Sequence, residues 1–243
     1  PGGPASTLTV NGIVTKAESF SNSLSIAGTI EANEQVDIRS EVSGLVTDIL
    51  FNEGSTVSKG KVLLKINDLE LQAQLSQALT KQKLAQETEY RAGKLLEKEA
   101  ISKEEYDVAL SELRSLQSQT QLIRAQLAKT LIRAPFSGKI GLRTISAGEY
   151  ITPSSNIARL VSTNPVKILF SIPEKYAGTI KLDTKISFTV AGSKNTYTGT
   201  VYAIEPGIDM STRTLQLKAR ASNSNGDLLP GSFAKIDLPL SNI

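Results

Sequence analysis

The sequence contains no cysteine, no histidine and no tryptophan, and it has one methionine and only 5% aromatic residues. Without cysteine the chain has no disulfide, no thiolate metal site and no cysteine nucleophile. Without histidine it lacks the commonest general base and the commonest metal ligand. So few aromatic residues suit thin β-modules and coiled coil better than one thick core. We therefore expect several small cores.

Long blocks of one charge are also missing, because 27 basic residues stand against 24 acidic ones and the net charge is +3. This balance gives no support to nucleic-acid binding. No apolar run approaches the roughly 20 residues needed to span a bilayer, and the N-terminus lacks the apolar stretch of a signal peptide. We interpret residues 1–6 as a flexible spacer or a cloning remnant, so an upstream export signal or lipid anchor would not be seen.

The sequence does contain an internal repeat. Residues 38–68 match residues 132–162 at a constant offset of 94 positions without gaps, and Gly54 pairs with Gly148. Each copy has the apolar spacing of short strands, with glycines where the chain must turn. A unit of this size buries too little surface alone, so we expect the copies to pack as quasi-symmetric halves of one β-sandwich. The alternative is a chance resemblance between two glycine-punctuated stretches.

The stretch from Ser43 to Gly60 resembles half of the lipoyl and biotinyl carrier fold. In those carriers a modified lysine sits on a tight hairpin that joins the two halves. Here a 62-residue insert, 69–130, takes the place of that hairpin, and Lys59 and Lys61 fall in a turn of the first half. We interpret both lysines as solvated turn residues and expect no cofactor. A carrier subunit, detectable by the mass of bound lipoate or biotin, is the competing function from another class.

The insert 69–130 predicts two helices, since it contains no proline. Asn67 and Asp68 are N-cap candidates for the first helix, with Glu70 placed as in a capping box. Ser102 caps the second helix in the same way, with Glu105 at the third position. Both helices repeat a partly polar seam at steps of four and three, the spacing of a coiled coil. The seam positions are Leu71, Leu75, Ala78, Gln82, Ala85, Glu89, Ala92 and Leu96, followed by Tyr106, Ala109, Leu113, Leu116, Thr120, Ile123, Leu127 and Thr130.

A turn near residues 99–102 folds these helices antiparallel, which gives an arm about 45 Å long at about 1.5 Å per residue. Apolar residues on one stripe cannot build a globular core, so we expect the arm to project and to touch a distant partner with its tip. Catalysis would need a cavity instead. A structural spacer or an oligomerisation element is the alternative.

The rest of the chain is strand-like and predicts a small β-barrel closed by strands from both sides of the insert, which leaves no exposed sheet edge. The expected fold class is mainly β with an inserted α-helical coiled-coil hairpin, a half-lipoyl sandwich and a small β-barrel, in an elongated molecule. The expected domains are a barrel of 23–37 and 163–240, a lipoyl-like domain of 38–68 and 131–162, and a hairpin of 69–130.

This nested order resembles the HlyD-type periplasmic adaptors, or membrane fusion proteins, and especially those of resistance-nodulation-division (RND) efflux pumps. The resemblance covers nearly the whole chain and rests on the stretches 41–44, 100–106, 132–138 and 227–233, each weak alone and strong in this order. It implies a non-catalytic adaptor that is attached to the inner membrane. Its partners would be an inner-membrane RND transporter and a TolC-type outer-membrane channel, and its role the export of drugs or other small molecules. A homo-oligomer, in the pump a hexameric ring, is also implied.

In that family the hairpin tip has an arginine, a leucine four residues later and a serine seven residues after that, described as the contact with the outer-membrane channel. Arg91, Leu95 and Ser102 have this spacing, so the resemblance implies that they bind the channel. Arg91 and Leu95 are one helical turn apart and share a face. The plainer alternatives are a helix cap for Ser102 and a solvated charge for Arg91.

The family also builds a membrane-proximal domain from residues before and after the barrel. Only residues 1–22 and the last residues, 241–243, are left for it here, so we expect it to be partial, with a truncated C-terminal end. An ABC-type exporter is an alternative partner. Copper binding is not expected from Met210 alone. An enzyme is not expected either, because no nucleophile and base pair and no phosphate loop stands out.

Overall fold

The computed structural model describes residues 23–193 and 195–239, and the expectations for residues 1–22 and 240–243 lie outside them. The chain divides into two compact units. The first unit contains residues 167–221 with the segments that end at Ile30 and begin at Gly231. The second unit contains Glu31–Val166 and Ser222–Pro230.

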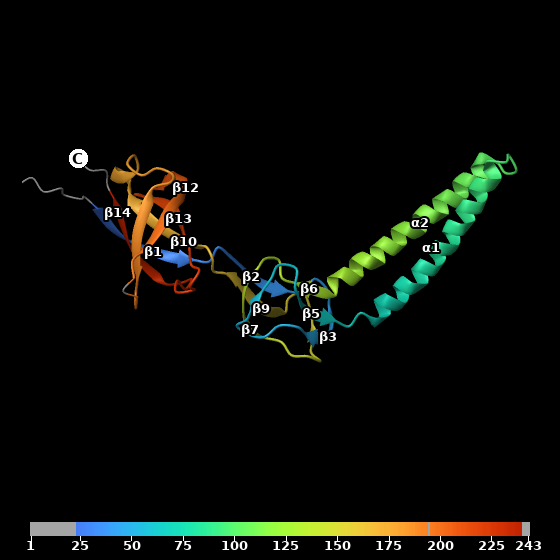
Figure 1. The fold of residues 1–243 in the computed structure, drawn as a ribbon, viewed down its shortest axis with the longest axis horizontal. Coiled ribbons are helices and arrows are strands. Elements are labelled where there is room, and N and C mark those ends of the chain that lie inside the picture. Colours follow the sequence, from blue (N-terminus) through green and yellow to red (C-terminus); the bar gives the residue numbers. More distant parts are fainter. Residues whose placement is uncertain (1–22, 194, 240–243) are drawn as a thin grey trace, which may run out of the picture. The chain divides into compact units, whose positions relative to one another are not determined.

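The first unit is a closed six-stranded β-barrel (Figure 1). Buried and less buried side chains alternate along its strands, because successive side chains of a strand point to opposite faces. Its first strand precedes the helices in sequence and pairs antiparallel with its last, so the predicted barrel closed from both sides of the insert is confirmed. Around the barrel the strands are β1 (Ser23–Glu31), β10 (Val166–Pro173), β13 (Thr214–Ala221), β12 (Tyr197–Asp209), β11 (Lys185–Val190) and β14 (Phe233–Pro239), and the 3-10 helix η1 (Glu174–Tyr176) follows β10.

The second unit contains two four-stranded sheets packed around one apolar core. One sheet has the order β2 (Glu34–Arg39), β9 (Asn156–Ser162), β7 (Gly138–Arg143) and β4 (Thr56–Val57). The other has the order β6 (Leu131–Arg133), β5 (Val62–Ile66), β3 (Gly44–Ile49) and β8 (Tyr150–Ile151). Each sheet takes strands from both copies of the repeat, so the copies interleave instead of forming one sheet each.

The sequence repeat is also a structural repeat. Strands β3, β4 and β5 begin 94 positions before β7, β8 and β9, the offset found in the sequence. Matched core residues are equally buried, as Val57 and Ile151 are at 1% and 0% exposure. Gly54 and Gly148 both have positive φ, 72° and 84°, which glycine adopts without a Cβ clash. These correspondences confirm the duplication and exclude a chance resemblance.

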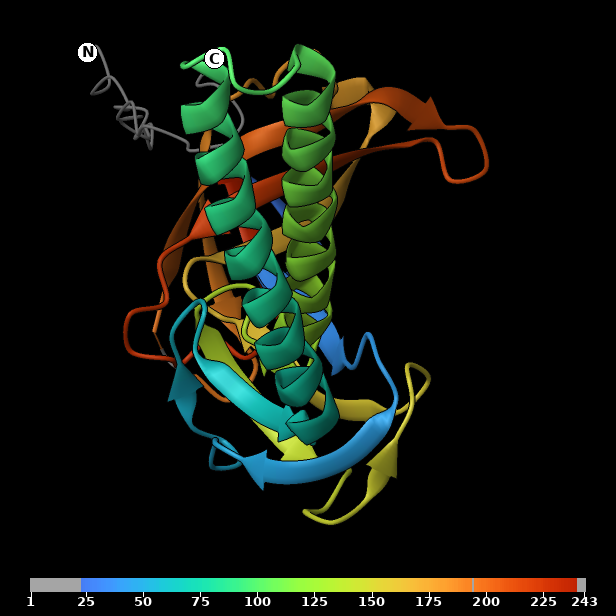
Figure 2. The same cartoon turned by 90° about the vertical axis from the view of Figure 1, so that its right-hand side faces the viewer.

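Two helices, α1 (Leu69–Leu96) and α2 (Lys103–Lys129), stand between β5 and β6 in the chain and lie side by side and antiparallel (Figures 1 and 2). Every predicted seam position is buried or partly buried, including the polar residues Gln82 and Glu89. Of the other α1 residues from 71 to 96, only Gly93 is not exposed. The seam predicted from the sequence is therefore the face along which the two helices pack.

The start of α2 has the capping box that its sequence predicts. The backbone N–H of Glu105 donates to the Ser102 hydroxyl at 3.2 Å, and the Ser102 backbone N–H donates to the Glu105 carboxylate at 3.0 Å. Two of the N–H groups left unpaired at a helix start are satisfied in this way.

The capping box predicted for α1 from Asn67 and Glu70 is wrong. The N-cap residue is Asp68, and its side chain makes no capping hydrogen bond. Its nearly buried carboxylate pairs with the Lys65 ammonium at 3.3 Å, because a buried charge needs a counter-charge. Asn67 instead accepts a hydrogen bond of 3.1 Å from the backbone N–H of Leu69.

Lys59 and Lys61 are exposed at a turn between β4 and β5, where Gly60 has a φ of 82°. The backbone N–H of Lys59 donates to the Ser137 hydroxyl at 2.9 Å. Both lysines therefore lie inside the first copy of the repeat, as the sequence indicates, and the connection between β5 and β6 is occupied by α1 and α2.

Candidate functional site: the tip of the helix pair

The candidate site is the tip of the helix pair, which we define as residues 88–106. Seam residues Ala92 and Leu96 are turned toward α2, so Leu95 is left outside the helix contact and is 45% exposed. Arg91 is exposed one turn earlier, and its guanidinium donates to the Thr88 hydroxyl at 3.2 Å. An apolar side chain and a positive charge therefore share one outward face of α1.

This outward face continues away from the tip as an exposed row on α1. Leu84, which is 62% exposed, comes four residues before Thr88; Arg91 follows three residues after Thr88, and Leu95 four residues after Arg91. A hollow of about 390 Å³ opens between the helices beside this row, and the small side chains of Ala85 and Ala109 line it with others. The row thus combines exposed leucines with an uneven apolar surface.

Ser102 lies at the other side of the turn, as the N-cap of α2. Its hydroxyl and its backbone N–H are both hydrogen-bonded to Glu105, and not to Arg91 or Leu95. The structure therefore brings Arg91 and Leu95 onto one face of one helix and places Ser102 at the start of the next. The exposed Ser102 side chain remains at the surface of the tip.

The turn that joins the helices has a defined backbone. The N–H of Ala100 donates to the Leu95 carbonyl, and the N–H of Glu99 donates to the Leu96 carbonyl, both at 2.9 Å. This pair of hydrogen bonds is the Schellman motif, which satisfies carbonyls at a helix end. It requires a left-handed residue, and Glu99 takes that conformation with a φ of 56°. The sequence offers no glycine as a signal here.

Sequence reasoning also missed a polar link across the seam at the tip. The Tyr106 phenol donates a hydrogen bond of 2.8 Å to the Glu89 carboxylate, which raises the pKa of Tyr106. Gly93 packs beside the same ring, where a Cβ would lie 3.5 Å from Tyr106 Cε2. A glutamate and a tyrosine at seam positions were the available signal, since polar seam residues need partners.

Surface charges at the tip are partly paired. Lys94 lies 3.2 Å from the Glu97 carboxylate, and this hydrogen bond raises the pKa of Lys94. The Lys94 ammonium also lies 5.8 Å from the centre of the Tyr90 ring, which is 64% exposed. The tip therefore offers aromatic, apolar and basic groups for non-covalent contact.

The described residues were also compared with what a metal site and a membrane span would need. Residues 23–193 and 195–239 contain no group of three acidic, histidine or cysteine side chains placed to hold a metal ion. Over the same residues no helix has both the length and the apolar character needed to cross a bilayer.

Comparison with known families matches both units of the chain. The barrel-sandwich hybrid domain of RND membrane fusion proteins matches residues 34–163. The CusB-like β-barrel domain matches residues 165–241.

Among similar curated proteins, the multidrug resistance protein MdtA of Photorhabdus laumondii is 30% identical over 89% of this chain and 60% of its own length. MdtA of Pectobacterium carotovorum is 29% identical over 96% of this chain and 62% of its own length. The solvent efflux pump periplasmic linker SrpA of Pseudomonas putida is 28% identical over 90% of this chain and 61% of its own length. The chain thus spans about three fifths of the length of these relatives.

Solved structures share the fold. A MacA–MexA chimera that contains the α-hairpin domain of Pseudomonas aeruginosa MexA has a TM-score of 0.81 at 21% identity, over 94% of this chain and 84% of the chimera. A putative efflux transporter from Bacteroides eggerthii has a TM-score of 0.77 at 23% identity, over 96% of this chain and 74% of the transporter chain. With a barrel-sandwich match over more than half of its residues, this chain belongs to the membrane fusion proteins of RND-type pumps.

Proposed function

We propose that this chain is the adaptor part of a tripartite efflux pump, which links an inner-membrane RND transporter to a TolC-type outer-membrane channel in the periplasm. Its cargo would be drugs or other small molecules. Membership of the RND membrane fusion proteins supports this role. Relatives named as a multidrug resistance protein and as a solvent efflux pump periplasmic linker support it further.

In this proposal α1 and α2 form a projecting coiled-coil hairpin, and its tip binds the outer-membrane channel through Arg91, Leu95 and Ser102. The observation that carries the proposal is the exposure of Leu95, 45%, on a helix whose seam is already occupied by α2. An exposed leucine beside an arginine is typical of interface anchors, because burial of the leucine supplies binding energy and the guanidinium supplies directed hydrogen bonds.

We also propose that copies of the chain assemble side by side, as a hexameric ring in the pump. The exposed row of α1 and the hollow beside it supply an uneven surface for such a neighbour, on which exposed leucines alternate with polar and charged groups.

The tip proposal is tested by Leu95→Asp in the full-length protein, produced with its transporter in cells that lack the native adaptor. We expect drug export to be lost, because a carboxylate cannot be buried in an apolar contact without a partner. Leu122→Asp is the matched control, since Leu122 is a similarly exposed leucine, at 54%, on α2 and outside the tip. It should leave export intact.

Circular dichroism must show equal helix content in both variants. Unchanged export by Leu95→Asp would overturn the tip contact. A photo-crosslinking residue at position 95 gives a second readout, because it should capture an outer-membrane protein in cells. Capture of the neighbouring adaptor alone would assign Leu95 to the ring and not to the channel.

A further inference from the structure

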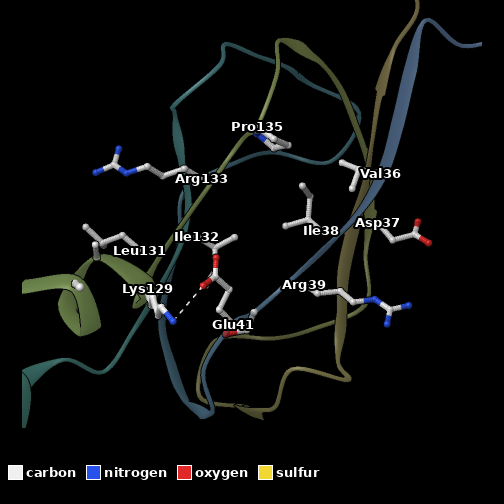
Figure 3. Close-up of a pocket in the computed structure, with 13 residues that line it drawn as sticks. Val36, Asp37, Ile38, Arg39, Glu41, Lys129, Leu131, Ile132, Arg133 and Pro135 are labelled. Carbon is white, nitrogen blue, oxygen red and sulfur yellow. Dashed lines mark ion pairs between the residues drawn. The ribbon is translucent and has the colours of Figure 1, made fainter. Parts of the chain in front are cut away.

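A second surface lies in the sandwich, away from the tip. A hollow of about 700 Å³ opens between strand β2 and strand β6, beside the last turn of α2 (Figure 3). Its lining includes Val36 and Ile38 from β2, Leu131 and Ile132 from β6, and Pro135 after β6. The hollow therefore runs along two strands and has an apolar floor.

Both strands that flank the hollow are sheet edges. β2 pairs only with β9, and β6 pairs only with β5. In an antiparallel edge strand, alternate residues turn their N–H and C=O groups away from the neighbouring strand. Across residues 23–193 and 195–239, no backbone hydrogen bond reaches β2 from its other side. The free edge of β2 thus presents a row of unpaired backbone donors and acceptors to the hollow.

The side chains of β2 alternate as an added strand would require. The side chains of Val36 and Ile38 turn toward β6 in Figure 3, whereas those of Asp37 and Arg39 extend to the other side of β2, where both residues also line the hollow. Ile38 is 5% exposed and belongs to the sandwich core, but Val36 on the same face is 36% exposed. The sandwich core is therefore not covered beside Val36. The uncovered space can hold another apolar side chain.

Charges on the outer face of β2 are unbalanced. The Asp37 carboxylate is 2.8 Å from Nε of Arg159 and is already paired. Lys129 and Glu41 form a second ion pair of 3.6 Å at the edge of the hollow. Within the described ranges no carboxylate pairs with Arg39. An acidic side chain directly across from Arg39 would therefore be complementary to it.

We propose that this hollow binds an extended peptide segment of another protein, which adds to the sheet as a strand along β2. The peptide would turn apolar side chains at alternate positions toward Val36 and Ile38 and an acidic side chain toward Arg39. Strand addition of this kind takes affinity from backbone hydrogen bonds and specificity from alternate side chains. β2 is the template, because it has six residues, whereas β6 has three and is soon followed by Pro135, which has no N–H.

The observations favour a peptide over a small apolar molecule. A small molecule could fill the space beside Val36 and meet Arg39, which also lines the hollow, but it would leave the backbone edge of β2 unpaired. An added strand would pair with the backbone edge of β2, cover the apolar floor and place a carboxylate near Arg39.

The test uses the whole chain and a fluorescein-labelled peptide, Thr-Val-Glu-Val-Glu-Val-Thr, followed by fluorescence anisotropy. Two N-methylated versions, one at the valines and one at the glutamates, remove backbone donors on opposite edges of the peptide. We expect one version to lose binding and the other to keep it, because one edge of the peptide pairs with β2. Replacing both glutamates by lysine should weaken binding, and hydrogen exchange of β2 amides should slow when the parent peptide binds.

Protein variants give an independent readout. Val36→Asp should weaken peptide binding at least about tenfold, since a carboxylate would replace the apolar contact. Arg39→Glu should weaken it by up to about fivefold, the upper end for a cross-strand charge pair. The matched controls are Leu142→Asp, at an exposed leucine of β7, and Arg124→Glu on α2, and both should bind as the parent chain does.

Three results would overturn the proposal. The first is equal binding by both N-methylated peptides, and the second is binding that Val36→Asp does not change. The third is saturable binding of the dye 1-anilinonaphthalene-8-sulfonate that depends on Val36 while the peptide does not displace it, which would assign the hollow to small molecules.

Discussion

The phenol of Tyr106 on α2 donates a hydrogen bond of 2.8 Å to the carboxylate of Glu89 on α1, and so joins the two helices near their tip. We expect Tyr106→Phe to loosen the tip, because the Glu89 carboxylate then faces the seam without its donor. Hydrogen exchange of the amides around Gly93 should become faster. Tyr90→Phe is the control, since its exposed ring lies outside the seam. Equal exchange in both variants would contradict a role for this hydrogen bond.

The same pair predicts a pH dependence. The hydrogen bond raises the pKa of Tyr106 above its ordinary value of 10.0, and the stabilising form is the protonated phenol. The stability that this hydrogen bond contributes is therefore fully present below pH 10, and it is lost as the pH rises through the raised pKa of Tyr106. The difference in thermal unfolding between the parent chain and Tyr106→Phe should shrink over that range. A difference that persists in strong alkali would point to packing of the ring.

Glu99 is expected to be a suboptimal residue for its place in the turn. Its φ of 56° suits glycine, so Glu99→Gly should stabilise the helix pair by about 1 kcal/mol. Glu97→Gly replaces the same residue type at a φ of −58°, also removes the ion pair with Lys94, and should destabilise the helix pair by about 1 kcal/mol. Urea denaturation followed by helical circular dichroism measures both. Shifts of the same sign would show that charge, and not backbone conformation, decides the effect.

Asn223 holds the loop that ends at Pro230 through its side chain. Its amide donates to the carbonyls of Thr163 and Leu228 and accepts from the Leu228 N–H, at distances of 2.8 to 2.9 Å. Asn223→Ala leaves these groups unpaired where Leu228 is 1% exposed, so it should cost about 3 kcal/mol. Asn195→Ala, at an exposed loop, should change the unfolding free energy by less than about 0.5 kcal/mol.

The two copies of the repeat should respond differently to the same mutation. A Cβ at Gly138 would lie 2.5 Å from the Val161 carbonyl oxygen, which belongs to the backbone of β9. At the matched Gly44 the nearest atom is Cγ2 of Ile66, on a buried β-branched side chain that shifts only if its core neighbours repack. Gly138→Ala should therefore cost about 3 kcal/mol, because backbone must shift, and Gly44→Ala about 2 kcal/mol, because one core side chain must repack. Equal losses of stability in thermal unfolding would mean that the backbone of β9 shifts at the same cost in free energy as the Ile66 side chain.

Asp209 provides a pH prediction for the hairpin between β12 and β13. The Ser211 hydroxyl and the backbone N–H groups of Thr212 and Ser211 all donate to its carboxylate, which lowers its pKa from 3.8 to about 2. The stability that these hydrogen bonds give the turn should thus be fully present above pH 3.8, and it should be lost as the pH falls through about 2. A carbon NMR titration should place the midpoint of Asp209 near 2, and Ser211→Ala should move it upward. Ser222→Ala, in another loop, should leave it unchanged.

Part of the tip was predictable because its determinants are local. The box of Ser102 and Glu105 joins neighbours in sequence, and the seam follows from helical periodicity, so both could be seen without coordinates. The box expected at Asn67 did not form, because the N-cap is the second candidate, Asp68, whose carboxylate pairs with Lys65 and makes no capping hydrogen bond.

By itself the sequence determined the strands, the two helices with their contact face, and the duplication at an offset of 94, because side-chain periodicity and glycine placement act within a few residues. Tertiary structure decided how the copies interleave across two sheets, since strand order depends on pairing between distant segments. It also decided that Glu89 meets Tyr106, that Glu99 takes the left-handed turn, and that Val36 borders an open edge. Each of these depends on which surfaces remain unpaired after packing, a property of the folded chain as a whole.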